Sequence, residues 1–572
     1  MFHINIRREN RTIEAEAGSN LLEVLRDAGI EVNAPCGGGG VCGKCKVKIY
    51  GENERIVKAC ETLVESDLEL DPMMEEEGVQ ILTKGLLDDV LFYPDLRKVW
   101  IKVPECPFGK SISEWSRLTE ALREELFIRR DFQVNLQAAS ELKRILKEND
   151  QMVWVVLFRD RILQVSAEEP QIYMAAFDIG TTTLAAYLLD GCDGRELCTA
   201  SRKNPQTQYG ADVISRANYA LEHGTEEITG CIRHAVQEML DELAEKAKIS
   251  VRDIYAVSAV GNTCMHHLFL GVSVESLVLA PYNPAVSEGL TLRCRDCDLT
   301  VHPEGVLLLL PNIAGFVGAD TAACIVSSNM AQQKEWTLLI DIGTNGEMVL
   351  GKENTMYTCS TAAGPAFEGA KISCGMRGAE GAISKIRWAE DHWEFETIGK
   401  KKVKGICGSG LLDLAAELLK TGQMDEVGVL EEGKQVLIAT AEQTENGEPL
   451  YLLQKDIAEL QLAKAAIAAG IKLLAKKAGI QLEEICQVWI AGAFGNFLSP
   501  ESACAIGMIP GELRGRIKGI GNAAGEGAKQ VLKNQVLWEA VQEQTREIEF
   551  LELATLAEFQ DCFVDELEFP EA

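Results

Sequence analysis

A short pattern that occurs twice in this 572-residue chain constrains its fold more than any other feature. MAAFDIGTTTLAAYLL (residues 174–189) and TLLIDIGTNGEMVL (residues 337–350) each predict a β-strand, a D-I-G-T turn and a second strand. The glycine lets the backbone approach a phosphate closely, and threonine hydroxyls and backbone N–H groups donate to phosphate oxygens. The aspartate at each turn suits Mg²⁺, which prefers oxygen ligands. Two such hairpins that face each other would hold a nucleotide from both sides.

The two hairpins resemble the phosphate-1 and phosphate-2 motifs of the ATPase superfamily of actin, sugar kinases and heat-shock chaperones. AGFVGADTAAC (314–324) resembles the first connecting helix of that superfamily, and IGNAAGEGAKQVL (520–532) resembles the second. QVWIAGAFGNFL (487–498) resembles the adenosine motif. The five motifs occur in the order of the superfamily, which implies a two-lobed ATPase domain.

This resemblance implies roles for individual residues. Asp178 and Asp341 are expected to position Mg²⁺, and Asp320 matches the acidic residue that lies near the attacking water. Glu347 is the alternative for orienting that water. The residues expected to contact the nucleotide are Gly180, Thr181, Thr182, Gly343, Thr344 and Asn345 at its phosphates and Gly492, Ala493 and Gly495 at its adenosine.

Two glycine-rich stretches, residues 362–376 and 405–419, lie between the second hairpin and the adenosine motif. In the second stretch, Gly408, Ser409 and Gly410 open a predicted helix whose N-terminus would favour an anion or a ribose. A helix-entry turn with a purely structural role is the alternative.

Four cysteines near the N-terminus form the second informative pattern. Cys36, Cys42, Cys45 and Cys60 have the spacing C-x5-C-x2-C-x14-C, and glycines crowd the loop that carries the first three. A 2Fe–2S cluster requires four thiolates, and the glycines allow backbone N–H groups to point at its sulfides. A zinc site is the alternative, but such sites usually have two C-x2-C pairs, and this segment has one. We predict a 2Fe–2S cluster on these cysteines.

The residues around these cysteines predict a small ferredoxin-like domain. A hairpin is expected from the strands 2–8 and 11–16, and a helix is expected between Ser19-Asn20 and Gly29. Further strands are expected at 46–50 and 78–83. This segment resembles the β-grasp fold of plant-type and adrenodoxin-type ferredoxins, although its short final cysteine gap departs from both.

Other metal-binding candidates are weaker. Cys294 and Cys297 form a lone C-x2-C pair and are not expected to bind a metal. His266 and His267 are adjacent, so they face different ways on a helix, and we predict buried or surface histidines there.

Net charge and hydropathy limit the classes of partner. The charge of −31 is spread along the chain, and such a field repels nucleic acid and anionic membrane surfaces. No stretch approaches 18 uninterrupted apolar residues, and the start does not predict a signal peptide. We therefore expect a cytoplasmic protein that binds neither nucleic acid nor membrane.

The chain is too long for a single hydrophobic core, so several domains are expected. The predicted fold class is multidomain, α+β and α/β. The predicted domains are a β-grasp 2Fe–2S ferredoxin-like domain (1–84), a linker (85–97), a small α/β middle domain (98–172) and a two-lobed, actin-like (ribonuclease H-like) ATPase domain (173–572).

The whole architecture resembles the reductive activators of corrinoid-dependent methyltransferases from anaerobic bacteria. The resemblance implies that ATP drives one-electron transfer from the 2Fe–2S cluster to a corrinoid protein, which returns inactive Co(II) to Co(I). It implies an upstream electron donor and a homodimer as well. The implied cofactors are the 2Fe–2S cluster, ATP and Mg²⁺.

Three alternatives remain open at this point. A dehydratase-type activator would carry one 4Fe–4S cluster shared between subunits, whereas this chain has four cysteines of its own. A small-molecule kinase with a redox-sensing ferredoxin domain would act without a corrinoid partner. A non-enzymatic redox scaffold would bind nucleotide without hydrolysing it.

Overall fold

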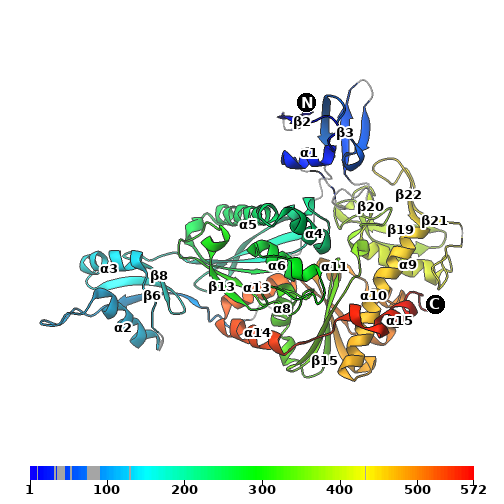
Figure 1. Cartoon of the computed structure of the whole chain (residues 1–572). Helices are drawn as coiled ribbons and strands as arrows, with labels where there is room; N and C mark the ends of the chain where they lie inside the picture. The colour runs from blue at the N-terminus through cyan, green and yellow to red at the C-terminus, as the bar shows by residue number, and fades with distance from the viewer. Residues whose placement is uncertain are drawn as a thin grey trace.

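A computed structural model describes residues 1–8, 11–30, 32, 34, 45–51, 54–73, 90–127, 131–431 and 433–571 (Figure 1). Figure 1 shows an N-terminal domain in blue, a small α/β domain in cyan, and two larger lobes that hold most of the chain. Within these ranges, no helix combines the length and the apolar character that crossing a membrane requires.

The N-terminal domain is a five-stranded mixed sheet with the strand order β2-β1-β5-β3-β4. Alternate strand residues such as Ile4, Ile6 and Val47 are buried together with Leu21 and Leu25 of the helix. Its described elements are β1 (Phe2–Ile6), β2 (Arg11–Ala15), α1 (Leu21–Asp27), β3 (Lys46–Tyr50), β4 (Arg55–Lys58) and β5 (Leu68–Pro72).

The predicted hairpin, helix and strand at 46–50 are confirmed in this domain. Asn20 caps α1, because its side chain accepts hydrogen bonds from the N–H groups of Leu22 and Glu23. The predicted strand at 78–83 lies outside the described residues. The strand that pairs with both β1 and β3 is β5, which comes earlier in the chain.

The small α/β domain is an antiparallel sheet with two helices. Leu118 and Leu122 of the first helix and Leu142 of the second share a core with the sheet residues Val153 and Val155. The first strand begins at Leu96, inside the predicted linker. The described elements are β6 (Leu96–Lys102), α2 (Glu114–Leu126), α3 (Leu136–Glu148), β7 (Met152–Phe158) and β8 (Arg161–Ser166).

The first lobe is built on a six-stranded sheet with the order β11-β10-β9-β12-β14-β13. The strands β9, β10 and β11 form an antiparallel meander, and β12 and β14 run parallel to β9. The strands are β9 (Tyr173–Ile179), β10 (Thr183–Asp190), β11 (Glu196–Lys203), β12 (Ile254–Val260), β13 (Leu290–Arg293) and β14 (Val306–Leu309). The helices of this lobe are α4 (Val213–His223), α5 (Glu226–Ala247), α6 (Thr263–Leu270) and α7 (Glu275–Val278), with α8 (Ala319–Ser327) after the last strand.

The second lobe repeats this plan with the strand order β24-β23-β15-β16-β17-β25. Its meander is β15 (Trp336–Ile342), β16 (Gly346–Lys352) and β17 (Thr355–Thr361), followed by β23 (Ile485–Ala491), β24 (Ile517–Gly521) and β25 (Glu549–Phe550). Two small sheets extend the lobe and consist of β18 (Ala382–Ala389), β19 (His392–Thr397), β20 (Gly405–Ile406), β21 (Gln435–Ala439) and β22 (Leu450–Leu453). Its helices are α9 (Gly408–Lys420), α10 (Gln454–Ala478), α11 (Gly492–Phe497), α12 (Pro500–Ala505) and α15 (Ala557–Asp565).

The C-terminal part of the chain crosses back to the first lobe. Helices α13 (Ala523–Lys533) and α14 (Gln535–Glu547) follow β24, yet α13 packs on β9, β12 and α8. Figure 1 shows both helices in orange-red beside the green elements of the first lobe. Helix α13 therefore connects the two lobes.

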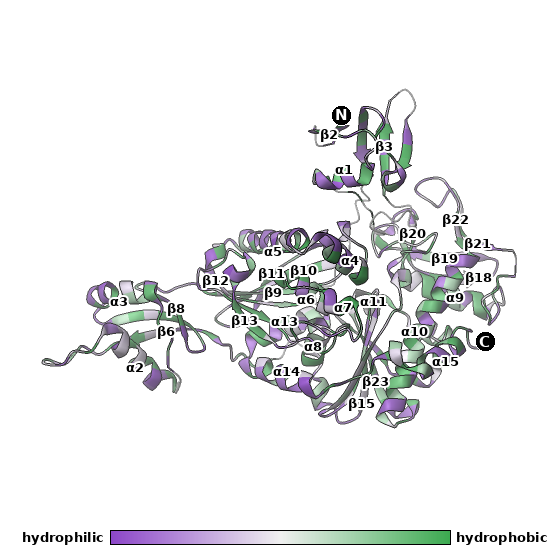
Figure 2. Ribbon diagram, in the orientation of Figure 1, coloured by the Kyte–Doolittle hydropathy of each residue, from purple (hydrophilic) through white to green (hydrophobic). Residues whose placement is uncertain are grey.

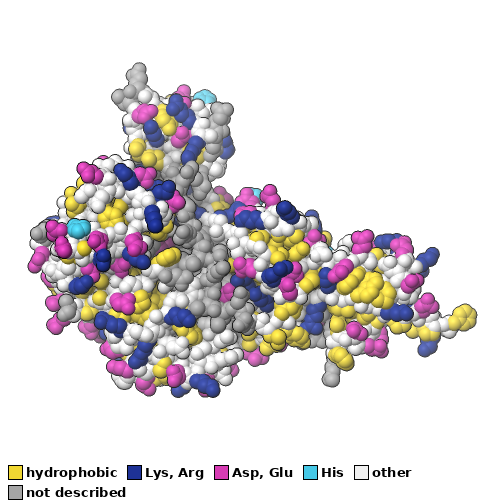
Figure 3. Space-filling view, turned by 180° about the vertical axis from the view of Figure 1, so that it is seen from behind, with side chains coloured by type: hydrophobic (Ala, Val, Ile, Leu, Met, Phe, Trp, Pro, Cys, Tyr) yellow, Lys and Arg dark blue, Asp and Glu magenta, His cyan; other side chains and the backbone are white. Residues whose placement is uncertain are grey.

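Hydropathy and charge follow this architecture. Figure 2 shows mostly hydrophobic residues along the central strands of both lobes and polar residues on outer helix faces. On the face in Figure 3, acidic and basic side chains are interspersed, although the chain as a whole is strongly acidic.

Candidate functional site

The two D-I-G-T turns line one cavity of about 330 Å³ that both lobes bound. Thr181 and Thr182 lie in the turn between β9 and β10, and Thr344 and Asn345 lie in the turn between β15 and β16. Glycine is required at the first turn, because a Cβ at Gly180 would lie 2.7 Å from the carbonyl oxygen of Thr183. The structure thus brings together the two segments that the sequence predicts to face each other.

Four carboxylates converge on this cavity. Asp178 and Asp341 end the first strand of each hairpin, Asp320 lies in the first turn of α8, and Glu347 lies on β16. All four residues are half-buried in the cavity between the lobes. That burial raises the pKa of Asp178 and of Asp320 to about 7 and the pKa of Asp341 to about 6. It also raises the pKa of Glu347. Carboxylate oxygens are the ligands that Mg²⁺ prefers, although no three His, Cys, Asp or Glu side chains among the described residues lie close enough together to form a metal-binding group.

The two candidates for orienting water are held differently. Oδ1 of Asp320 accepts a hydrogen bond from the N–H of Thr321 at 2.7 Å. Oε1 of Glu347 accepts a longer bond, 3.5 Å, from the hydroxyl of Ser360. Both side chains line the cavity, so either carboxylate can contact a water molecule bound there.

The other end of the cavity is aromatic and glycine-rich. The rings of Phe367 and Phe494 stack with centroids 5.3 Å apart. Gly408 passes close beneath them, since a Cβ there would lie 2.2 Å from the carbonyl oxygen of Phe367. Gly492, at φ +81°, lies beside the carboxylate of Asp341. Aromatic rings beside glycine backbone are suited to a purine and its ribose.

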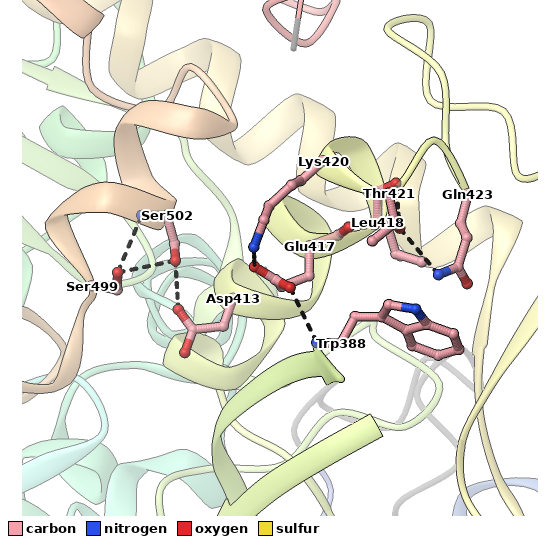
Figure 4. Close-up of polar contacts among 9 residues, drawn as sticks. All are labelled: Trp388, Asp413, Glu417, Leu418, Lys420, Thr421, Gln423, Ser499 and Ser502. Atoms are coloured by element: carbon pink, nitrogen blue, oxygen red, sulfur yellow. Dashed lines mark hydrogen bonds and ion pairs between the residues drawn. The ribbon is translucent and has the colours of Figure 1, made fainter. Parts of the chain in front are cut away.

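Helix α9 presents its first residues, Gly408 and Ser409, to the cavity. Figure 4 shows how its body is fixed: Asp413 accepts a hydrogen bond from Ser502 of α12 at 2.6 Å. One turn later, Glu417 accepts one from the N–H of Trp388 on β18 at 3.1 Å. These contacts hold the helix N-terminus in place against the cavity.

Two predicted residues, Gly410 and Gly495, have other surroundings. Gly410 faces β18, where a Cβ would lie 2.3 Å from the carbonyl oxygen of Ile383. Gly495 faces β23, where a Cβ would lie 2.6 Å from the carbonyl oxygen of Ile490. Neither lines the cavity, and both allow a helix to pack closely on a strand. The side chain of Ala493 lies outside the described residues.

Several cavity residues were missed by the sequence analysis. Asn262 caps α6 and donates a hydrogen bond to the hydroxyl of Thr181 at 2.8 Å. Asn522 caps α13 and donates one to Asp178 at 2.9 Å. An asparagine directly before a helical segment is a recognisable cap, but sequence gives no sign that its amide also reaches a distant hairpin. Glu368 and Arg377 also line the cavity; Glu368 lies within the glycine-rich stretch 362–376 and Arg377 directly follows it, but neither was singled out as a site residue.

Arg216 stabilises the first D-I-G-T turn through hydrogen bonds to backbone carbonyl groups. It is fully buried on α4 and donates hydrogen bonds to the carbonyl oxygens of Thr181 at 2.5 Å and Gly210 at 2.9 Å. Burial lowers its pKa to about 10. This guanidinium fixes the backbone of the turn and places positive charge behind it.

The histidine and cysteine pairs that were weaker candidates for metal binding are buried. His267 is enclosed, with Nδ1 2.7 Å from the carbonyl oxygen of Thr263, and His266 is 4% exposed. Burial lowers the pKa of His266 to about 3. Cys294 and Cys297 are 1% and 2% exposed. Of the two environments that the sequence left open for these histidines, buried or surface, the structure shows the buried one.

Half of the predicted cluster site is described. Cys36 and Cys42 lie outside the described residues. Cys45 precedes β3, Cys60 lies in the short helix Ala59–Glu61, and their Sγ atoms are 3.1 Å apart. Two thiols this close have the arrangement needed to bind one metal atom, which fits a cluster that takes two thiolates on each iron.

Comparisons with known proteins cover the whole architecture. Residues 4–75 match a 2Fe–2S iron–sulfur cluster binding domain, residues 85–171 the RACo linker region and residues 173–333 the RACo middle region. Residues 335–572 match the C-terminal domain of RACo, the ASKHA domain.

The chain is similar to proteins that share most of its length. It is 33% identical over 550 residues to the corrinoid activation enzyme RamQ of Eubacterium limosum, with 91% of each chain covered. It is 24% identical to the [Co(II) methylated amine-specific corrinoid protein] reductase of Methanosarcina barkeri, covering 70% of this chain and 77% of that protein. A solved structure, described as a reductive activator for corrinoid, iron–sulfur protein, aligns with a TM-score of 0.76 and 30% identity over 100% of this chain and 98% of that one. The predicted fold class is confirmed.

Proposed function

The chain belongs to the RACo family of reductive activators of corrinoid proteins, and on that basis we propose how its parts divide the work. The protein is an iron–sulfur ATPase that uses ATP to return a corrinoid protein from inactive Co(II) to Co(I). The observation that supports this most directly is the cavity where two phosphate hairpins from opposite lobes meet four carboxylates.

In the ATPase domain, Asp178 and Asp341 position Mg²⁺, and the turn residues around Thr182 and Thr344 donate to phosphate oxygens. Bound Mg²⁺ supplies positive charge that offsets the charge of the phosphates and the carboxylates. Asp320 or Glu347 accepts a hydrogen bond from the attacking water. The stacked rings of Phe367 and Phe494, with Gly408 and Gly492, bind the adenosine end.

In the N-terminal domain, Cys36, Cys42, Cys45 and Cys60 hold the cluster. The 2Fe–2S cluster supplies one electron, and the electron acceptor is the cobalt of the partner. The buried β-sheet and helix core keep the thiols of Cys45 and Cys60 adjacent, so that little rearrangement accompanies gain or loss of the electron. An upstream donor must replace the electron after each cycle.

Nucleotide binding is coupled to the partner through the two lobes. Each lobe contributes one hairpin, so a triphosphate that contacts both favours one relative arrangement of the lobes. A ligand shifts such an equilibrium by its difference in affinity for the two arrangements. We propose that the favoured arrangement binds the Co(II) form of the corrinoid protein and that the protein acts in the cytoplasm as a homodimer.

Anoxic mixing tests this function. The reduced protein is combined with an oxidised corrinoid protein of a methyltransferase system, with and without MgATP, and cobalt absorbance is followed. We expect Co(I) or methyl-cobalt bands that depend on MgATP. Hydrolysis of ATP without any change in cobalt absorbance, across several corrinoid partners, would favour the kinase with a redox-sensing domain instead.

A further inference from the structure

Glu368 joins the two phosphate hairpins through a single carboxylate. Its Oε2 accepts a hydrogen bond from the hydroxyl of Thr182 at 3.0 Å, and its Oε1 accepts one from the hydroxyl of Thr344 at 2.5 Å. Thr182 belongs to the first lobe and Thr344 to the second. The three residues, called here the Glu368 bridge, therefore link the lobes across the cavity.

The carboxylate is held firmly where it is. Glu368 ends the short helix Pro365–Glu368, and the next residue, Gly369, has φ +75°. A Cβ at Gly369 would lie 2.4 Å from the carbonyl oxygen of Met376, so the segment packs against neighbouring backbone. Phe367, immediately before, stacks on Phe494. The position of the carboxylate thus follows from the packing around it.

The carboxylate of Glu368 is held by hydrogen bonds from two hydroxyl groups and not by an ion pair with any described lysine or arginine. Among the described residues, no lysine or arginine forms an ion pair with Glu368, and the buried Arg216 attracts its carboxylate only from a longer distance. The 2.5 Å contact with Thr344 has the length of a charge-assisted O–H···O⁻ hydrogen bond. A phosphate would use the same two hydroxyls in the same way, because it also presents negatively charged oxygens to donors.

We propose that Glu368 is a built-in competitor of the nucleotide's terminal phosphates. In the Glu368 bridge, its carboxylate occupies the two threonine hydroxyls and holds the lobes together. MgATP binds fully only when the carboxylate gives up both hydroxyls and moves away from the phosphates. The displacement links the arrival of ATP to a change in the contact between the lobes. This inference rests on the proposed function, which assigns Thr182 and Thr344 to phosphate binding.

The competition has a direct consequence for affinity. The apparent dissociation constant rises as the fraction of molecules with free threonine hydroxyls falls. Removing the negative charge of Glu368 would therefore improve binding of ATP, whereas damage to the site would weaken it. A gain in affinity is the result that a merely structural role does not give.

The test measures equilibrium binding of MgATP, its non-hydrolysable imido analogue and AMP to the full chain and to the Glu368→Gln variant. We expect the variant to bind both triphosphates about tenfold more tightly, the change expected when about one net hydrogen bond no longer opposes binding. AMP lacks the terminal phosphates, so its affinity should stay unchanged. Glu394→Gln is the matched control, because Glu394 pairs with the exposed Arg387 on the β18–β19 hairpin, away from the cavity.

The outcomes are distinguishable. Equal or weaker triphosphate binding by a folded Glu368→Gln variant, with its cluster absorbance and unfolding temperature unchanged, would overturn the proposal and assign Glu368 to metal or phosphate binding. A second variant, Glu368→Asp, keeps the charge and shortens the reach, and it should also bind ATP more tightly than the wild type. If the wild-type protein itself binds no triphosphate, the proposed function fails, independently of Glu368.

Discussion

Asn522 donates a hydrogen bond from its Nδ2 to Oδ2 of Asp178 at 2.9 Å, so the cap of a helix near the C-terminus supports the first phosphate hairpin. The same Nδ2 lies 3.2 Å from the hydroxyl of Tyr187 on β10. Helix α13 follows a strand of the second lobe but packs in the first, so the first hairpin is supported by a segment that returns from the second lobe.

Replacing Asn522 by alanine removes both the cap of α13 and the donor to Asp178. We expect a loss of about 1 kcal/mol of stability from the cap and, in addition, weaker MgATP binding because the carboxylate is no longer oriented. Isothermal titration measures the affinity. Asn135→Ala is the control, since Asn135 caps α3 in the small α/β domain through the N–H of Ala138. Equal nucleotide affinity in the two variants would contradict the role assigned to Asn522.

Replacing Asp341 by asparagine keeps the size of the side chain and removes a charge that the proposed Mg²⁺ requires. We expect ATP hydrolysis to fall by roughly two orders of magnitude or more, because metal contacts supply several kcal/mol of transition-state stabilisation. The absorbance and electron paramagnetic resonance spectra of the cluster should stay as in the wild type. Hydrolysis at the wild-type rate would mean that Asp341 does not position the metal.

The sequence predicted the hairpins well because each is a continuous segment whose alternation and turn residues are local. The cysteine spacing was readable for the same reason. Glu368, Asn262 and Asn522 were missed because their roles depend on which distant segment lies opposite. In residues 261–267, the sequence draws attention to His266 and His267, which are buried, whereas Asn262 is the residue that donates to Thr181. Gly410 and Gly495 were assigned to the nucleotide from their motifs, yet their glycines serve close packing of a helix on a strand.

Replacing Cys45 by serine removes one thiolate from the adjacent pair. We expect the anoxically purified variant to lose most of its iron and sulfide, because an alkoxide ligand is a poor substitute for a thiolate, while its ATP hydrolysis remains. Iron and sulfide are measured chemically. Cys106→Ser, at an exposed thiol in the small α/β domain, should keep the wild-type iron content. Full iron content in the Cys45 variant would exclude Cys45 as a ligand.

Acid should destabilise the first lobe through His302. Its ring stacks on Tyr255 with centroids 4.1 Å apart, and burial lowers its pKa from the usual 6.5 to about 4. The imidazole therefore binds a proton more readily in the unfolded chain than in the folded one. The contribution of neutral His302 to the free energy of unfolding is complete above pH 6.5 and is lost as pH falls toward 4. Uptake of this one proton lowers the free energy of unfolding by at most about 1.4 kcal/mol per pH unit.

The measurement is the unfolding temperature between pH 7 and pH 5. His302→Gln cannot take up that proton, so its unfolding temperature should fall less steeply with acid than that of the wild type. Parallel curves for the two proteins would show that His302 does not titrate with unfolding.

The division of labour between the two sites is tested most directly by anoxic cobalt reduction with three proteins side by side. With a Co(II) corrinoid protein and MgATP, the wild type should produce Co(I). Neither Asp341→Asn nor Cys45→Ser should produce Co(I), and the two variants should lose different steps. The first should keep its cluster spectrum without hydrolysing ATP, and the second should hydrolyse ATP without a cluster spectrum. Cobalt reduction by either variant at the wild-type rate, or loss of both properties from one folded variant, would contradict the account.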